Sequence, residues 1–322
     1  MKAFRVRPLA GLLALGLCCV ASAETIVGLT TTNALVRFDS ATPGTIAATV
    51  AVTGLQSGEL LLGIDFRPAT QTLYGLGSTS RLYSINTTTG AATQVGSAGA
   101  FTLSGSAFGF DFNPTVDRIR VVSNTGQDLR LNPNDGTLTA TDTALAYAVG
   151  DVHAGATPRI VGSAYTNNFA GATTTTLYAI DSSFDILATQ NPPNAGTLNT
   201  VGALGVDTSD LVGFDISGAT GVSFASLASP TGNRSQLFTI NLASGVATLL
   251  GTISANATLV DISVVAAPVP EPGTYALMVV GLVALSAAVR QRAARELIRQ
   301  ADSPRVCSVL VGHSARLSSA NI

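Results

Sequence analysis

A pattern of four short apolar segments recurs along the chain, and this repeat restricts the fold more than any other feature. Residues 61–96 and 211–251 share one order of parts: a Gly-x-Asp segment, a small-residue segment, a Leu-aromatic-x-Ile-Asn segment, a glycine turn and a last segment that ends in glycine. A third copy covers 108–141, and a less regular one covers 160–189. Each segment has about five residues, alternates in polarity and lies between Gly, Asn, Asp or Pro, as short antiparallel strands require.

A fifth copy is divided between the two ends of the repeat region. Residues 258–265 match the first segment of a copy, and residues 25–50 match the other three. Joined together they complete one sheet and close a ring without open edges. The sequence therefore predicts an all-β fold, a single β-propeller of about five four-stranded blades closed by pairing of the N- and C-terminal strands. A six-bladed ring stays open as an alternative, with 142–160 or 191–210 adding strands.

The N-terminus has the three parts of a cleaved secretory signal. Basic residues within "MKAFRVR" precede the apolar run "PLAGLLALGLCCV", and small residues follow at Ala21 and Ala23. We expect a signal helix and a signal peptide over 1–23, and hence export.

The region between the two ends carries a negative charge and no cysteine. Residues 24–267 contain eight arginines, no lysine and sixteen Asp or Glu, which gives a formal net charge of −8. Nucleic-acid binding needs a basic surface, so we expect no nucleic-acid partner. Because no disulfide can form here, the domain must be stabilised by core burial alone.

The C-terminus combines "VPEP" at 269–272, an apolar stretch at 274–289 and an arginine cluster. This arrangement resembles the PEP-CTERM sorting signal. The resemblance implies export, a transmembrane helix that pauses in the inner membrane with its arginines inside, and cleavage by an exosortase-like protease. At 16 residues the apolar stretch is shorter than the usual span of about 20, which suits a transient anchor. The residues assigned to processing are Ala21, Ala23, Pro270, Glu271 and Pro272, and those assigned to anchor retention are Arg290, Arg292 and Arg295.

Two features of this end leave alternatives open. An ordinary permanent single-span anchor has the same parts. Sorting signals of this kind end soon after the arginines, whereas this chain continues for 27 residues, as a cytoplasmic or atypical tail. We divide the chain into a signal peptide (1–23), a repeat domain (24–267), a sorting segment (268–295) and a tail (296–322).

Three stretches of the repeat domain resemble the exported domain-of-unknown-function family 4394. They are "GIDFRP" with the residues that follow it, "FGFDFNPTVDRIRVVS" from residue 108, and "TQNPPNAGTLNTVGALGVD" at 189–207. The resemblance covers about residues 25–265 and implies no activity. The propeller prediction comes from the repeat.

A recurring aspartate is the best candidate for a site. Asp65, Asp111, Asp215 and Asp261 are spaced by 46, 104 and 46 residues, and the remaining copy has a replacement near Ala164. If the first strand of each blade is innermost, four carboxylates ring the axis and could bind a cation through oxygen ligands. The favoured interpretation is structural, with each carboxylate accepting backbone N–H groups at a turn or between blades.

Other polar residues are weaker candidates. His153, near Asp151, is the only histidine of the domain, and without a nucleophile motif it is expected to be an exposed surface residue. Glu59 lacks a partner at the separation that glycoside hydrolysis demands. The "NPNDG" motif at 132–136 is interpreted as a turn, since a calcium loop needs more acidic ligands. For Arg67, Arg118 and Arg120 we expect ion pairs to Asp117 or a neighbouring blade.

These observations favour a non-catalytic surface or extracellular-matrix protein that binds exopolysaccharide as a scaffold, without a cofactor. It would be exported in a Gram-negative-type bacterium, held in the inner membrane by 274–289 and then released to the surface. One alternative is a secreted propeller lyase or hydrolase that acts on a surface polymer. A second is a permanently anchored protein-interaction module.

Overall fold

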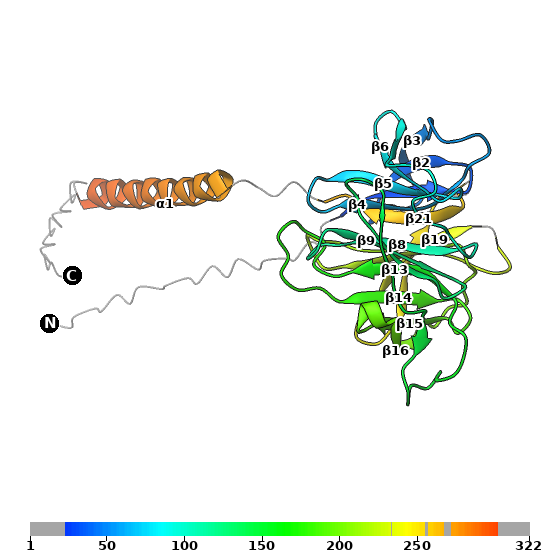
Figure 1. Ribbon diagram of the computed structural model, residues 1–322. Helices are drawn as coiled ribbons and strands as arrows, with labels where there is room; N and C mark the ends of the chain where they lie inside the picture. Colours follow the sequence, from blue (N-terminus) through cyan, green and yellow to red (C-terminus); the bar gives the residue numbers. More distant parts are fainter. Residues whose placement is uncertain (1–22, 233, 255–256, 267–271, 302–322) are drawn as a thin grey trace, which may run out of the picture. The chain divides into compact units, whose positions relative to one another are not determined.

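The computed structural model describes residues 23–232, 234–254, 257–266 and 272–301 (Figure 1). The chain forms two compact units, which divide at Ala267 and Pro268 and are described separately. The signal peptide predicted at 1–23 lies outside the described residues except for the exposed Ala23.

The first unit is a β-propeller of five blades. Four blades have four strands, and one has a fifth, short strand at its outer edge. The blades, each from its inner to its outer strand, are β21 (Leu259–Val264), β1 (Thr25–Thr30), β2 (Ala34–Asp39) and β3 (Ile46–Ala51); β4 (Leu61–Arg67), β5 (Thr72–Gly77), β6 (Arg81–Ile85) and β7 (Ala92–Val95); β8 (Phe108–Asn113), β9 (Arg118–Ser123), β10 (Asp128–Leu131) and β11 (Leu138–Thr141); β13 (Ile160–Tyr165), β14 (Leu177–Asp181), β15 (Ile186–Gln190), β16 (Thr197–Ala203) and β12 (Ala146–Tyr147); and β17 (Val212–Ile216), β18 (Ser223–Ala228), β19 (Ser235–Ile240) and β20 (Ala247–Thr252).

The ring closes as the divided repeat predicts. β21 pairs antiparallel with β1, so that the last strand of the domain completes the sheet begun by the first three. The inner strands contact one another in the order β21, β4, β8, β13, β17 and back to β21, and Figure 1 shows several of them together at the centre of the unit. The alternative of six blades is wrong, because 142–160 adds only the short outermost strand β12 and 191–210 supplies the fourth strand of the same blade, β16.

The glycine turns of the repeat join the blades at their outer edges. Gly90 has a φ of +74°, and a Cβ there would lie 2.0 Å from the Ala51 carbonyl oxygen of the preceding blade. Gly136 repeats the arrangement, with a φ of +69° and a Cβ position 2.3 Å from the Val95 oxygen. This glycine ends the "NPNDG" motif, in which its N–H donates to the Asn132 carbonyl, so the motif is the expected turn. Only glycine combines this conformation with so close a backbone contact.

The apolar core lies between neighbouring blades. Phe110 and Phe112 of β8 face Tyr74 of β5, and the Tyr74 and Phe112 rings meet edge to face with centroids 5.2 Å apart. Because inner-strand residues alternate in direction, these apolar side chains point toward one neighbour and Asp111 points the other way. The inner strands therefore carry apolar packing on one side and polar groups on the other.

The second unit contains the helix α1 (Pro272–Ala301). No helix of the described residues is long and apolar enough to cross a membrane, which differs from the predicted transmembrane helix. The apolar stretch ends after 16 residues, and α1 then continues through Arg290, Arg292 and Arg295. The α1 side chains described at these three positions are exposed.

Candidate functional site

All four repeated aspartates are buried on inner strands. Asp65, Asp111 and Asp215 are each 1% exposed, and Asp261 is 5% exposed. One carboxylate oxygen from each of Asp65, Asp111 and Asp215 lies within 4.8 Å of the others. We call these three residues the axial cluster. The structure thus gathers three of the four predicted aspartates into one group and leaves Asp261 outside it.

Each aspartate of the axial cluster binds the next blade through a backbone N–H, as the structural interpretation of these residues expects. In the first two cases the donor follows the equivalent position of the next inner strand. The bonds run from Phe112 N to Asp65 Oδ2 (2.8 Å), from Tyr165 N to Asp111 Oδ1 (3.0 Å) and from Val264 N to Asp215 Oδ2 (2.6 Å).

The last inner strand departs from the expected equivalence by two residues. Ser263 takes the place of an aspartate: its Oγ accepts from Phe66 N at 3.1 Å and donates to Asp65 Oδ1 at 2.8 Å. Asp261 instead matches the glycine position of the other strands, and its Oδ2 accepts from Ile64 N at 2.8 Å. A Cβ on Gly63 would lie 3.3 Å from that same oxygen, so glycine makes room for the carboxylate.

The fourth copy contributes no polar group at this position. Ala164 is fully buried in an apolar cluster. The N–H of Ile216, which an aspartate at position 164 would bind by analogy, donates to Oδ1 of Asp215 at 2.6 Å. The five equivalent positions of the inner strands, which we call the ring, therefore carry three carboxylates, the hydroxyl of Ser263 and the methyl group of Ala164.

Burial disfavours the charged form of these carboxylates. It raises the pKa of Asp65 and of Asp111 well above the usual range, and the neighbouring aspartates add to the effect. Burial raises the pKa of Asp215 to about 6, against the opposing effect of the N–H groups of Val264 and Ile216. In the part of the chain that the structure describes, no arginine or histidine forms an ion pair with the axial cluster.

A second buried polar cluster contains a positively charged side chain, Arg120. Arg120 of β9, only 1% exposed, pairs with Asp128 and Asp142 at 2.6 Å each. Its other nitrogens donate to Asn194 Oδ1 at 2.7 Å and to the Tyr165 hydroxyl at 3.3 Å. We call this group the Arg120 cluster. Burial raises the pKa of Asp128 to about 6, while the adjacent guanidinium opposes that shift.

The remaining predicted arginine contacts differ in kind. Arg67 of β4 binds Asp117 in the turn of the next blade, as expected, and donates to Asn134 at 2.8 Å. The expectation is wrong for the other two arginines. Arg120 pairs with aspartates of its own blade, and Arg118 forms no ion pair among the described residues but donates to the backbone oxygens of Val116 and Asp117. The Arg67 and Arg118 side chains therefore hold turns in place.

His153 differs from the expectation of an exposed residue. Its side chain is 20% exposed, and its ring packs against those of Phe184 and Tyr147, with centroids 4.2 and 5.3 Å away; these two rings also meet each other, at 6.0 Å. Nδ1 lies 3.1 Å from the Thr200 hydroxyl, which itself donates to Asp151 at 2.8 Å. The histidine is thus a packed and hydrogen-bonded part of blade four.

Glu59 also has a structural environment. It is 3% exposed and accepts hydrogen bonds from the Tyr83 hydroxyl at 2.6 Å and from Gln56 N at 3.2 Å. Thr79 donates to it through both its hydroxyl and its N–H. These contacts fold the loop before β4 onto β5 and β6.

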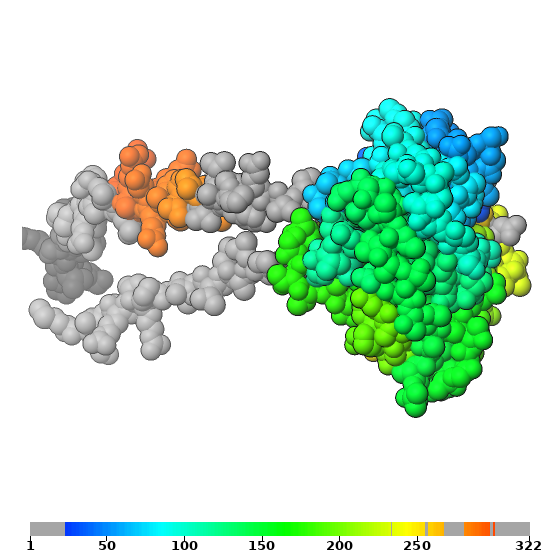
Figure 2. Space-filling view, viewed as in Figure 1, coloured from blue at the N-terminus to red at the C-terminus, as the bar shows by residue number. Residues whose placement is uncertain are grey.

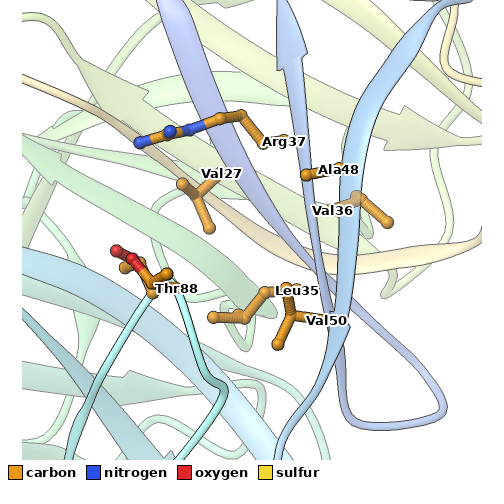
Figure 3. A pocket seen from close by; sticks show the side chains of 8 residues that line it. Val27, Leu35, Val36, Arg37, Ala48, Val50 and Thr88 are labelled. Atoms are coloured by element: carbon orange, nitrogen blue, oxygen red, sulfur yellow. The ribbon is translucent and has the colours of Figure 1, made fainter.

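The described pockets of the propeller contain no carboxylate or histidine. One, of about 170 Å³, lies between the first blade and the turn after β6, and its only charged side chain is Arg37 (Figure 3). A second, of about 310 Å³, is lined by small and apolar side chains together with several threonines. The face of the propeller seen in Figure 2 is continuous, without a deep hollow.

The residues assigned to processing fall largely outside the described part of the chain. Ala21, Pro270 and Glu271 belong to that undescribed part, and Pro272 is the first residue of α1.

Family comparison assigns the propeller and the C-terminal segment. The model for a domain of unknown function, DUF4394, matches residues 34–263. The chain belongs to this family. A PEP-CTERM protein-sorting motif matches residues 268–293, and it implies an exported protein that is sorted by an exosortase. No curated protein matches the DUF4394 chain.

Solved structures with related architecture are distant. A dihydro-haem d1 dehydrogenase, NirN, is 12% identical over 72% of this chain, with a TM-score of 0.36, and the match spans only 44% of that protein. A glutaminyl cyclase from Myxococcus xanthus is 13% identical, with 69% of this chain and 83% of the other covered and a TM-score of 0.42. A putative 6-phosphogluconolactonase from Bacteroides fragilis is 17% identical, with coverages of 75% and 70% and a TM-score of 0.39.

Sequence reasoning missed four contributors to the buried clusters. Ser263 was hidden because the motif "LVDISVV" offers Asp261 as the closer match to the repeat. Asn168 lies in the loop after β13, where no repeat pattern marks it. The Asp128 and Asp142 partners of Arg120 could have been suspected from the alternation of "DLRL", which turns Asp128 and Arg130 toward the same side.

Proposed function

We propose that this DUF4394 protein is a non-catalytic binding or scaffold module of an exopolysaccharide matrix, held transiently in the inner membrane and released to the cell surface. The sorting motif supports the route, since it implies export and exosortase processing. An exosortase-like protease is the implied partner, and polysaccharide is the proposed ligand of the released propeller.

One observation carries the non-catalytic part of the proposal. The candidate acid–base groups named from the sequence are all engaged in the fold: His153 packs against two aromatic rings, Glu59 accepts several hydrogen bonds, and the axial cluster is buried. General acid–base catalysis needs such a group within reach of a substrate. The described pockets of the propeller offer none.

The proposal is tested with the secreted protein and exopolysaccharide from the producing organism. Size-exclusion chromatography with light scattering follows the mass of both components over several hours. Co-elution with an unchanged polymer mass is the expected result. Separate elution would remove polysaccharide as the ligand and favour a protein partner.

A falling polymer mass would instead make the protein a lyase or hydrolase. A parallel sample of His153→Ala then identifies the source of the activity. Polymer cleavage that His153→Ala abolishes, while the variant keeps its melting temperature, would assign catalysis to this residue and contradict the proposal.

The transient anchor has a separate test. Intact-mass spectrometry of the protein recovered outside the cell is expected to show a chain that ends near Pro270 and lacks the arginines of α1. A mature chain that keeps residues 274–322 would contradict release and identify a permanent anchor.

A further inference from the structure

We propose that the axial cluster, Asp65, Asp111 and Asp215, binds one divalent cation, and that calcium fits it best. Carboxylate oxygens from the three residues all lie within 4.8 Å of one another. Calcium takes oxygen ligands at about 2.3–2.6 Å, so ligands on opposite sides of it stand about 4.6–5.2 Å apart. All three carboxylates can therefore contact one ion. The site is independent of the proposed polysaccharide binding.

A side-chain oxygen without a partner among the described residues, beside the cluster, points to the same ligand. Asn168 is 9% exposed, and its Oδ1 is buried without a hydrogen-bond partner. Its carboxamide hydrogen-bonds to Asp215, which places it at the cluster. A half-turn of the amide exchanges its oxygen and nitrogen, so the side chain can present either a donor to Asp215 or an oxygen to a cation beside it.

The hydrogen bonds around the cluster orient the carboxylates without neutralising them. Phe112 N and Tyr165 N each hold one oxygen of an aspartate from the next blade. Ser263 Oγ lies between two members, 2.8 Å from Asp65 Oδ1 and 3.3 Å from Asp215 Oδ2. N–H donors stabilise carboxylates in their charged form. The blades thus preorganise the oxygens of three carboxyl groups around one point.

The charge balance gives the cation its physical role. Burying an unpaired carboxylate is costly, and the described residues place no arginine or histidine in an ion pair with these three. The nearby guanidinium of Arg120 already pairs with Asp128 and Asp142. A divalent ion would neutralise two of the three charges at a point where three inner strands meet.

The ligand chemistry selects among ions. Carboxylate, amide and hydroxyl oxygens suit calcium and magnesium, whereas zinc prefers nitrogen and sulfur ligands. Magnesium demands near-octahedral geometry at about 2.0–2.1 Å, with opposite oxygens about 4.0–4.2 Å apart. Calcium tolerates irregular coordination and is the expected occupant.

Thermal unfolding of the exported protein tests the site. The protein is freed of metal with EDTA and dialysed. Its thermal unfolding is then followed by far-ultraviolet circular dichroism at CaCl₂ or MgCl₂ concentrations from micromolar to millimolar. Calcium at about 100 times its Kd is expected to raise Tm by roughly 5–10 °C, and magnesium by less. Calorimetric titration is expected to show one calcium ion per chain.

Three variants separate the axial cluster from general calcium binding. Asp65→Asn and Asp111→Asn keep an oxygen to accept the backbone N–H but lose charge, and they are expected to lose the calcium shift. Asp181→Asn is the matched control, because Asp181 is another fully buried aspartate, bonded to Tyr147 and Arg159 N, and its calcium shift should equal that of the wild type.

Two results would overturn the proposal: no change in Tm of the wild type at millimolar calcium, or an equal shift in Asp111→Asn. Should the aspartate variants fail to fold, Asn168→Ala serves instead, with an expected calcium affinity about tenfold lower. Unchanged affinity in Asn168→Ala, or no bound calcium in equilibrium dialysis of the wild type, would likewise reject the site.

Discussion

The two buried polar clusters of the propeller differ in how their negative charges are compensated. The Arg120 cluster places a guanidinium between Asp128 and Asp142, so its charges are compensated by the chain itself. The axial cluster has three carboxylates and, among the described residues, no basic ion-pair partner. Tyr165 connects the two clusters: its N–H donates to Asp111, and its hydroxyl oxygen accepts a hydrogen bond from Arg120 Nε.

This difference shows that similar burial supports two kinds of site. A buried ion pair with satisfied hydrogen bonds is complete without an external ligand. The Arg120 ion pairs lie inside one blade, and the hydrogen bonds from Arg120 to Asn194 and Tyr165 fasten that blade to the next. Carboxylates gathered without a counter-charge remain incomplete until they take up protons or a cation. The axial cluster is therefore where an external ligand changes the stability of the propeller.

The largest expected effect comes from removing the internal cation. Arg120→Leu leaves Asp128 buried without a guanidinium, while Asp142 keeps its pair with Arg130. The unpaired Asp128 should lower the free energy of unfolding by about 3–5 kcal/mol. Urea unfolding followed by circular dichroism measures this loss. Arg118→Leu is the matched control on the same strand; its contacts are to backbone oxygens only, and a change below about 1 kcal/mol is expected. Equal losses in both variants would contradict the fastener role.

A smaller effect is expected from Ser263→Ala. The change removes the hydroxyl that donates to Asp65 and accepts from Phe66 N, and leaving these buried groups unpaired should cost about 1–3 kcal/mol. Ser226→Ala provides the control, because Ser226 is equally buried but its Oγ has no hydrogen-bond partner. The urea midpoint of Ser226→Ala should stay close to that of the wild type. A loss of stability as large as that of Ser263→Ala would contradict the claim that the hydrogen bonds of Ser263 stabilise the propeller.

The smallest effect is expected at an exposed pair. Arg159 binds Asp210, but the two side chains are 47% and 28% exposed. Water and salt screen such a pair, so Arg159→Met should change the free energy of unfolding by less than about 1 kcal/mol, and less again in 0.5 M salt. A loss comparable to that of Arg120→Leu would show that burial does not distinguish these ion pairs.

The fold followed from the sequence more completely than the site did. The divided repeat predicts the five blades and the pairing of β21 with β1, because each blade needs the same four-strand pattern and the ends supply one blade between them. Registers inside a blade are harder to predict. Asp261 matches the repeat by residue type, yet backbone pairing places Ser263 at the ring position, a shift of two residues that keeps the same face.

Contacts between distant segments were beyond sequence reasoning. The packing of His153 depends on Phe184, and the position of Asn168 depends on how the loop after β13 brings it to Asp215. In the C-terminal segment the motif was easier to predict than the structure. A few residues were enough to recognise the sorting motif, but no helix of the described residues is long and apolar enough to span a membrane, because the apolar stretch ends at residue 289.

Long-wavelength X-ray diffraction from crystals grown with calcium tests the central claim most directly. The account predicts one anomalous peak, at 2.3–2.6 Å from oxygens of Asp65, Asp111 and Asp215, and none at the Arg120 cluster. An axis without a peak, with carboxylate oxygens in direct contact at about 2.5–2.7 Å, would mean that the aspartates share protons instead. That result would contradict the cation site.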